Sequence, residues 1–193
     1  MPPDSDASKA RILRAAAAEF AEHGISGARV NRIAQRANAN KQLIYAYFGD
    51  KETLFDIVLR DRLAALAEDV PLDPADLPGY AGEVFDYILE HPELARLSGW
   101  ELLERDGACD TGDRRAASYR AKVAAVAEAQ RRGLADPHTD PVHLLALLLA
   151  LAATWLHSPY AVRALDEDGA EATRRRRREV VVEAARRVVA PPA

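Results

Sequence analysis

Apolar residues recur every three or four positions along most of this chain, which is the spacing of an amphipathic helix. Ile12, Ala16 and Phe20 follow this spacing near the N-terminus. No segment alternates convincingly with period two, so the pattern predicts an all-α chain without strands. The predicted helices cover residues 8–22, 30–37, 41–48, 51–68, 80–90, 92–104, 113–132, 141–157 and 171–189.

The residues between the predicted helices suit helix ends. Gly24 follows the first helix, at a position where a left-handed C-cap is needed. Asn38 tolerates left-handed dihedral angles better than most residues, while Asn40 and Asp50 are favoured N-caps. Prolines fall at helix starts or between helices, as in the stretch 70–78, where a missing N–H costs least.

The short helices 30–37 and 41–48, preceded by a supporting helix, form a helix-turn-helix arrangement. The N-terminal side chains of the second helix of such a pair are best placed to touch base edges in the major groove of DNA. Lys41 can donate to guanine, Gln42 can pair with adenine, and Leu43 can pack on a thymine methyl group. The remaining DNA-binding candidates are Arg29, Asn31, Tyr45, Tyr47 and Lys51. The last three of these could reach phosphate oxygens.

A longer pattern spans the first part of the chain and consists of Ile12-Leu13, Ala16-Ala17, Phe20, His23-Gly24, Ile33-Ala34, Ala37 and the unbroken run 40–55. This pattern resembles the signature of the TetR family of transcriptional regulators, over roughly residues 6–66. It departs from the family in three places. Asn38-Ala39 replaces the usual Gly-Val, Arg29 stands where a capping Ser or Thr is common, and Ala46 stands where His or an aromatic residue is frequent.

The resemblance implies an all-α homodimer with two domains in each chain. A helix-turn-helix DNA-binding domain would cover residues 6–66, with the helix-turn-helix itself at about 29–48. A C-terminal ligand-binding and dimerisation domain would cover residues 67–193. The implied function is that of a transcriptional regulator, most simply a repressor, that binds an inverted-repeat operator in double-stranded DNA. A small-molecule effector would release it from the operator.

The predicted helix 141–157 is apolar almost all round, so it requires cover on every side. The resemblance implies that the last two helices pair across the two-fold axis of the dimer. A four-helix bundle of 141–157, 171–189 and their copies satisfies both requirements. The predicted interface residues are Leu144, Leu148, Leu151, Trp155, Val181, Ala185 and Val188.

Aromatic residues on the middle helices are first of all core residues. In the TetR family the same helices surround the effector cavity, so a few of these side chains could line a pocket. The favoured ligand-binding candidates are Phe85, Trp100 and Tyr119, with the core role left open for each.

Charge is unevenly spread along the chain. The 193 residues contain 26 Lys and Arg against 30 Asp and Glu, for a net charge of −4. Residues 8–51 nevertheless carry eight basic and three acidic side chains, a net charge of +5. This asymmetry favours an anionic partner for the N-terminal part, although a solvated charged face gives the same count. The arginine run 174–178 points around a whole helix, so we expect it to be solvated or ion-paired.

Several classes of protein are disfavoured. The single cysteine, Cys109, excludes an internal disulfide framework and a Cys-rich zinc site. A redox-sensing thiol is a minor alternative, because no basic residue closer than Arg105 would activate it. The histidines lack metal-ligand spacing, so no metal or cofactor is expected. There is no Gly-rich phosphate loop, nucleophile elbow or paired-carboxylate motif, which argues against an enzyme. A helical protein that binds another protein and no longer reads DNA stays open as an alternative.

The expected location is the bacterial cytoplasm. No secretory signal is visible, and the longest apolar run, 144–156, is shorter than the roughly 20 residues that span a bilayer. No membrane partner is therefore expected. The preference for arginine over lysine, 22 to 4, fits a GC-rich bacterial genome.

Overall fold

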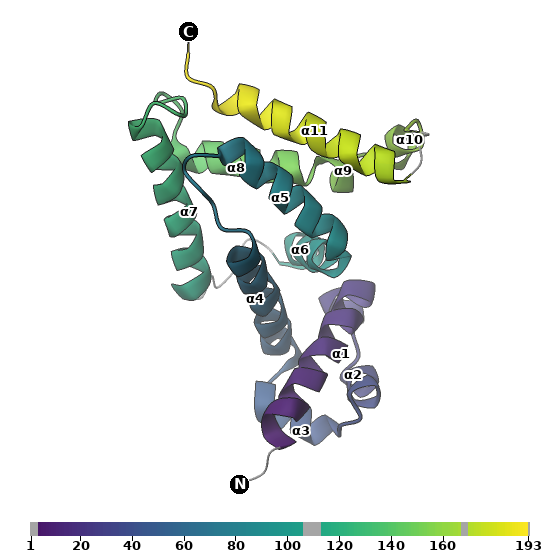
Figure 1. Ribbon diagram of the computed structural model, residues 1–193. Helices are drawn as coiled ribbons and strands as arrows, with labels where there is room; N and C mark the ends of the chain where they lie inside the picture. The colour runs from purple at the N-terminus through teal and green to yellow at the C-terminus, as the bar shows by residue number, and fades with distance from the viewer. Residues whose placement is uncertain (1–3, 106–112, 167–169, 193) are drawn as a thin grey trace. The chain divides into compact units, whose positions relative to one another are not determined.

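A computed structural model describes residues 4–105, 113–166 and 170–192 (Figure 1). Every regular element in these ranges is a helix, which confirms the all-α fold class. Cys109 lies outside the described residues. The helices are α1 (Asp4–Gly27), α2 (Val30–Ala37), α3 (Lys41–Phe48), α4 (Lys51–Asp69), α5 (Leu77–Glu90), α6 (Pro92–Glu104), α7 (Asp113–Arg131), α8 (Pro141–Ala152), α9 (Thr154–His157), α10 (Tyr160–Arg163) and α11 (Ala170–Val189).

The chain forms two compact units that interleave in sequence. Unit 1 comprises Met1–Ala65 and His91–Asp110, and unit 2 comprises Leu66–Glu90 and Thr111–Ala193. Helix α4 therefore begins in unit 1 and ends in unit 2. Helix α6 packs on α1, in unit 1, although α5 and α7 on either side of it in sequence belong to unit 2. The first change of unit falls at 65/66 and α6 returns to unit 1, whereas the division into domains at 66/67 stays a prediction.

The core of unit 1 is built on the apolar face predicted for α1. The rings of Phe20 and Phe55 meet edge to face, with their centroids 5.3 Å apart. Ile12, Ile33 and Ile44 bring α1, α2 and α3 to the same core, and all three are fully buried. Burial of such large apolar side chains supplies most of the favourable free energy that holds three short helices together.

Local signals set the ends of the short helices as predicted. Asn38 ends α2 in the left-handed conformation, with φ 48° and ψ 51°, and its N–H reaches the carbonyl groups of the last turn. The Asn40 side chain accepts a hydrogen bond from the Leu43 N–H at 2.7 Å and caps α3. Asp50 accepts from the Thr53 N–H at 2.7 Å at the start of α4. This hydrogen bond holds the pKa of Asp50 below its ordinary value.

Helix α1 consists of two helical segments that meet at Gly24. Gly24 has the expected positive φ, 71°, but helical hydrogen bonding resumes beyond it and the helix ends at Gly27. The Ala28 N–H donates to the Gly24 carbonyl at 3.2 Å, and this bond closes the additional turn. The predicted stop at His23-Gly24 therefore coincides with the break in helical backbone, and a separate short turn follows it.

Unit 2 is organised around α5, which packs against both α8 and α11. Asp76 caps α5 by accepting a hydrogen bond from the Gly79 N–H at 2.8 Å. Gly82 allows α5 and α11 to approach closely, because a Cβ atom there would lie 2.7 Å from Cγ2 of Val182. The predicted helix 141–157 is broken: α8 ends at Ala152 and α9 follows. Helix α10 was not predicted.

The arginine run on α11 is ion-paired, as expected. Arg174 lies 3.2 Å from Asp86 and Arg178 lies 2.6 Å from the same carboxylate. Arg177 lies 2.8 Å from Asp166 and stacks over the Trp155 ring at 4.2 Å from its centroid. These ion pairs connect α11 to α5 and to the segment after α10.

Candidate nucleic-acid interface

Helix α3 has one face inside unit 1 and one face in solvent. Ile44 and Phe48 are buried, whereas Lys41 and Gln42 are exposed in the first turn. Leu43 is half-buried, and its backbone N–H is bound by the Asn40 side chain. The candidates for base contacts thus lie at the N-terminal end of an anchored helix, which is the end that reaches base edges in helix-turn-helix proteins.

Two aromatic residues of α3 hold lysines beside this exposed face. The Lys41 Nζ lies 5.6 Å from the centre of the Tyr45 ring, and Tyr45 is 42% exposed. Tyr47 is half-buried, and the Lys9 Nζ lies 5.3 Å from its ring centre. Both are cation–π contacts, which restrain the lysine side chains while leaving their charge at the surface.

Lys51 stands at the start of α4 and already has a partner in unit 1. Its Nζ donates a hydrogen bond to the Ser26 carbonyl oxygen at 3.4 Å, and the side chain is half-buried. A phosphate contact by Lys51 would therefore share or replace this hydrogen bond. Arg29 and Asn31 are both exposed at the start of α2.

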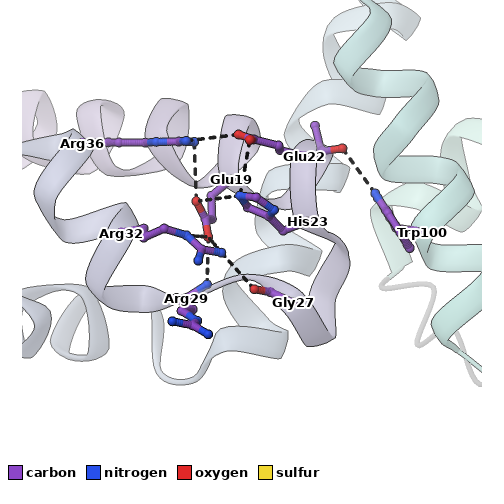
Figure 2. Close-up of polar contacts among 9 residues, drawn as sticks. Glu19, Glu22, His23, Gly27, Arg29, Arg32, Arg36 and Trp100 are labelled. Carbon is purple, nitrogen blue, oxygen red and sulfur yellow. Dashed lines mark hydrogen bonds and ion pairs between the residues drawn. The ribbon is translucent and has the colours of Figure 1, made fainter.

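The sequence reasoning missed Glu19, whose carboxylate is fully buried beneath α2. Figure 2 shows it facing Arg32, Arg36, His23 and the backbone of Arg29. Its Oε1 accepts hydrogen bonds from the Arg29 N–H at 2.9 Å and from the Arg32 Nε at 2.6 Å. Its Oε2 lies 3.5 Å from Nη1 of Arg36 and 3.9 Å from Nε2 of His23. The sequence did contain one signal for a buried carboxylate: Glu19 stands three positions after Ala16, and this spacing places it on the apolar face of α1.

The surroundings of Glu19 favour its ionised form. Burial alone would raise the pKa of Glu19, but the hydrogen bonds from Arg32 and from the Arg29 backbone, together with the charge of Arg32, hold it below the ordinary value of 4.5. Glu22 contributes a second, more exposed pair by lying 3.1 Å from Arg36. Two of the basic side chains counted near the N-terminus are thereby matched by carboxylates of α1.

The three ligand-binding candidates are not gathered in one unit. Phe85 is buried in α5 and Tyr119 is partly exposed on α7, both in unit 2. Burial, with Tyr119 nearby, raises the pKa of the Tyr80 hydroxyl. Trp100 belongs to unit 1, where its Nε1 donates to the Ala21 carbonyl oxygen at 3.3 Å (Figure 2). It lines a groove of about 350 Å³ between α1 and α6.

The predicted interface residues divide by burial within a single chain. Leu151 and Trp155 are half-buried, and Val188 is 37% exposed. The other four are at most 2% exposed in one chain, so they belong to the core of unit 2 rather than to its surface: Leu144, Leu148, Val181 and Ala185. Apolar periodicity alone does not distinguish a face that packs within one chain from a face that meets a second copy.

Neither a metal site nor a membrane span is found in the part of the chain that the structure describes. No cluster of three or more His, Cys, Asp or Glu side chains in residues 4–105, 113–166 and 170–192 could hold a metal ion. Among the same residues, no helix combines the length and the apolar character needed to cross a membrane.

Two family descriptions match the chain in succession. Residues 12–58 match "Bacterial regulatory proteins, tetR family", and residues 76–187 match "Tetracyclin repressor-like, C-terminal domain". The first match contains α2 and α3 entire, with the exposed residues of the candidate interface. The second covers more than half of the chain and includes most of unit 2 together with α6.

Individual proteins agree with these matches. The HTH-type transcriptional repressor SCO4008 of Streptomyces coelicolor is 46% identical over 171 residues, which are 88% of this chain and 89% of that protein. The crystal structure of SCO4942 from the same species has 40% identity and a TM-score of 0.83, over 96% of this chain and 99% of that one. A TetR family regulator from Marinobacter aquaeolei, 22% identical over 98% of this chain and 99% of its own, has a TM-score of 0.76 and supports the fold alone.

Proposed function

This chain belongs to the TetR family of bacterial regulatory proteins, and from that membership we propose how it recognises DNA and what its binding does. It is a DNA-binding transcriptional regulator rather than an enzyme. We propose that it acts in the cytoplasm as a homodimer, binds an inverted repeat and represses the adjacent gene. The name of the 46% identical relative, a transcriptional repressor, supports repression.

The exposed first turn of α3 carries the proposal for sequence recognition. Lys41 and Gln42 project from a helix whose opposite side is anchored by Ile44 and Phe48. A helix of this kind fits the major groove of B-DNA, where lysine can donate to guanine O6 and N7 and glutamine can pair with adenine N6 and N7. The Tyr45 hydroxyl and the Lys51 ammonium group would bind phosphate oxygens and set the register of the helix in the groove.

We propose that two copies of the chain assemble through α8 and α11. Two recognition helices related by a two-fold axis read an inverted repeat, with half-sites one helical turn or more apart. The side chains of α8 and α11 that are exposed in one chain, and so can meet a second copy, include Leu147, Val180 and Val188. The predicted bundle of the last two helices with their copies would cover these side chains.

Release by a small molecule completes the proposed cycle. Helix α4 begins in unit 1 and ends in unit 2, so it is one segment through which a ligand bound in unit 2 would act on α3. Any ligand that favours a state of lower DNA affinity must itself bind more weakly when DNA is bound, by the same factor. Phe85 and Tyr119, both in unit 2, are the candidate residues of that site.

Selection from a random pool of duplex DNA tests the function directly. The full chain should enrich sequences that contain an inverted repeat, and it should protect both half-sites of the selected operator from nuclease digestion. Measurement of the Kd at several salt concentrations then separates operator binding from non-specific binding. Enrichment of no duplex sequence, with dimer formation intact, would instead favour the helical protein that binds other proteins and no longer reads DNA.

A further inference from the structure

We propose that Glu19 is a positioning residue for operator recognition, because its buried carboxylate on α1 caps α2 from outside that helix. This inference rests on the proposed role of α3 in reading base edges. Glu19 itself is fully buried and would not contact DNA. It acts through the backbone of Arg29 and the guanidinium group of Arg32, the two groups that donate hydrogen bonds to its Oε1.

Helix α2 begins without the usual N-cap. Arg29 occupies the N-cap position in an extended conformation, with φ −122° and ψ 119°, and within the described residues its side chain makes no capping hydrogen bond. Ser, Thr, Asp or Asn is preferred there because a side-chain oxygen satisfies one of the free N–H groups of the first turn. The N-cap side chain of α2 therefore does not supply this hydrogen bond.

Glu19 provides the bond that a capping box would supply. In a capping box the side chain of Glu or Gln at the third helical position accepts a hydrogen bond from the N-cap N–H. In α2 the third helical residue is Arg32, a donor. Glu19 instead accepts from the Arg29 N–H at 2.9 Å and from Arg32 at 2.6 Å, both with one oxygen. Its negative charge also lies at the positive end of the α2 dipole.

Burial makes this arrangement specific. A fully buried carboxylate is costly unless it is paired and hydrogen-bonded, so the stable position of α2 on α1 is the one that brings Arg29 and Arg32 to Glu19. Arg32 also donates to the Gly27 carbonyl oxygen at 3.0 Å, which ties the same guanidinium group to the end of α1. Sliding or rotating α2 by even one residue would leave the Glu19 charge without these donors.

The position of α2 determines the position of α3. The two helices pack on each other and are joined by the short turn at Asn38, whose left-handed backbone leaves little freedom between them. An α2 helix fixed at its first turn by Glu19 therefore fixes the direction of α3 and of Gln42 at its start. The same contacts occupy Arg32, so Arg29, with its exposed side chain, is the arginine left at the start of α2 for DNA.

Two substitutions and one control test the proposal. Glu19→Leu fills the volume but removes both the charge and the acceptor, whereas Glu19→Gln keeps an acceptor and removes the charge. Glu22→Gln is the matched control, because Glu22 lies one turn away on α1 and contacts the same Arg36 without touching the α2 backbone. Each protein is compared with the unchanged chain for its melting temperature, its Kd for the selected operator and its Kd for unrelated duplex DNA. Both Kd values are measured well below the lowest melting temperature.

Positioning predicts a loss of discrimination in folded protein. Glu19→Leu should weaken operator binding about tenfold, the size of one lost base contact, with unrelated DNA bound within about twofold of the unchanged chain. Glu19→Gln should show a smaller loss of the same kind, about threefold, and Glu22→Gln none. A merely structural role would lower the melting temperature and leave the ratio of the two Kd values unchanged.

Two results would overturn the proposal, and a third would count against the proposed function instead. Operator discrimination equal to that of the unchanged chain in folded Glu19→Leu refutes positioning. If Glu19→Leu does not fold, unchanged discrimination in Glu19→Gln refutes it. If the unchanged chain binds no operator more tightly than unrelated DNA, that result counts against the proposed function and not against the role of Glu19. The two failures are therefore distinguishable.

Discussion

Glu104 accepts two hydrogen bonds from Ser26, one from its backbone N–H at 2.7 Å and one from its hydroxyl group at 2.6 Å. The same carboxylate accepts from the Ile25 N–H at 3.1 Å. Burial opposes its ionisation, but these hydrogen bonds, that of the Ser26 hydroxyl first, hold the pKa of Glu104 below its ordinary value. Glu104, at the end of α6, thus binds the turn that follows the kink at Gly24 in α1.

Removing this carboxylate should loosen the contact between α6 and α1. We expect Glu104→Gln to lower the free energy of unfolding by about 1 kcal/mol, because the hydrogen bonds to a charged acceptor become neutral ones in a largely solvated place. Urea unfolding followed by circular dichroism measures the change. Glu83→Gln, at an exposed position in the middle of α5, serves as the control and should stay within about 0.5 kcal/mol. Equal effects of the two substitutions would show that the Ser26 contact contributes nothing of its own.

Glu19 should make the fold sensitive to acid. Its pKa is lower in the folded chain than the ordinary value of 4.5, so its ionised form stabilises the fold above that pH. This stabilisation is lost as the pH falls through the lower, folded value. The melting temperature of the unchanged chain should therefore drop more steeply below pH 4.5 than that of Glu19→Gln, which has no proton to take up. Parallel curves over that range would contradict the pKa shift.

Base contacts and phosphate contacts should separate by mutation. Gln42→Ala should alter the preferred base at one operator position, at a cost of about 1–3 kcal/mol for the original base. Lys51→Gln should weaken all sequences alike and reduce the slope of log Kd against log salt by about 1. Binding to a panel of single-base operator variants at several salt concentrations measures both. An unchanged base profile in Gln42→Ala would remove Gln42 from the base-reading set.

Two adjacent leucines of α8 should respond differently to a charge. Leu148 is fully buried within one chain, whereas Leu147 is 46% exposed. Leu148→Arg would place an uncompensated cation in the core of unit 2, so it should abolish folding. Leu147→Arg should leave the monomer folded and, if α8 pairs with its copy, weaken the dimer and operator binding together. Light scattering with circular dichroism reads both properties. A folded Leu148→Arg, or a fully dimeric Leu147→Arg, would refute the corresponding half.

Trp100 should behave as a packing residue of unit 1. Trp100→Ala would remove the indole from the α1 surface and its hydrogen bond to Ala21, so we expect a loss of about 2 kcal/mol, below the 3–5 kcal/mol of a fully buried tryptophan. Phe85→Ala, in the core of unit 2, should reach that higher range. Thermal unfolding compares the two. A Trp100→Ala protein of unchanged stability and altered effector response would favour the ligand-binding role instead.

Local chemistry explains which parts of the fold could be predicted. The bounds of α2, α3 and α6 agree with the sequence analysis, because residues such as Asn38 and Asn40 act within their own turn. Neither glycine nor proline stands at the break between α8 and α9 at Ala153, so the local sequence does not predict this break. The cap from Glu19 joins residues ten positions apart across two helices, and periodicity cannot reveal such a contact.

Burial and unit membership were equally out of reach. A periodic apolar face shows that Leu144 and Val181 will be covered, but the covering surface belongs to the tertiary structure. Trp100 looked equivalent to Phe85 along the sequence, yet α6 packs on α1 while α5 packs on α8 and α11. Sequence order alone does not indicate which unit a helix joins.

The interleaving of the two units bears on how this regulator can be cut and recombined. A fragment that stops at Ala65 keeps α1 to α3 but lacks α6, and it loses the acceptor that Glu104 offers to Ile25 and Ser26. A working chimera with a foreign effector domain must therefore carry residues 91–105 along with the DNA-binding helices, grafted as an insert within the foreign sequence. A hybrid joined to a foreign domain at a single crossover near residue 66 would contain α1 of this chain and α6 of the foreign protein. The contact surfaces of these two helices would not be matched to each other.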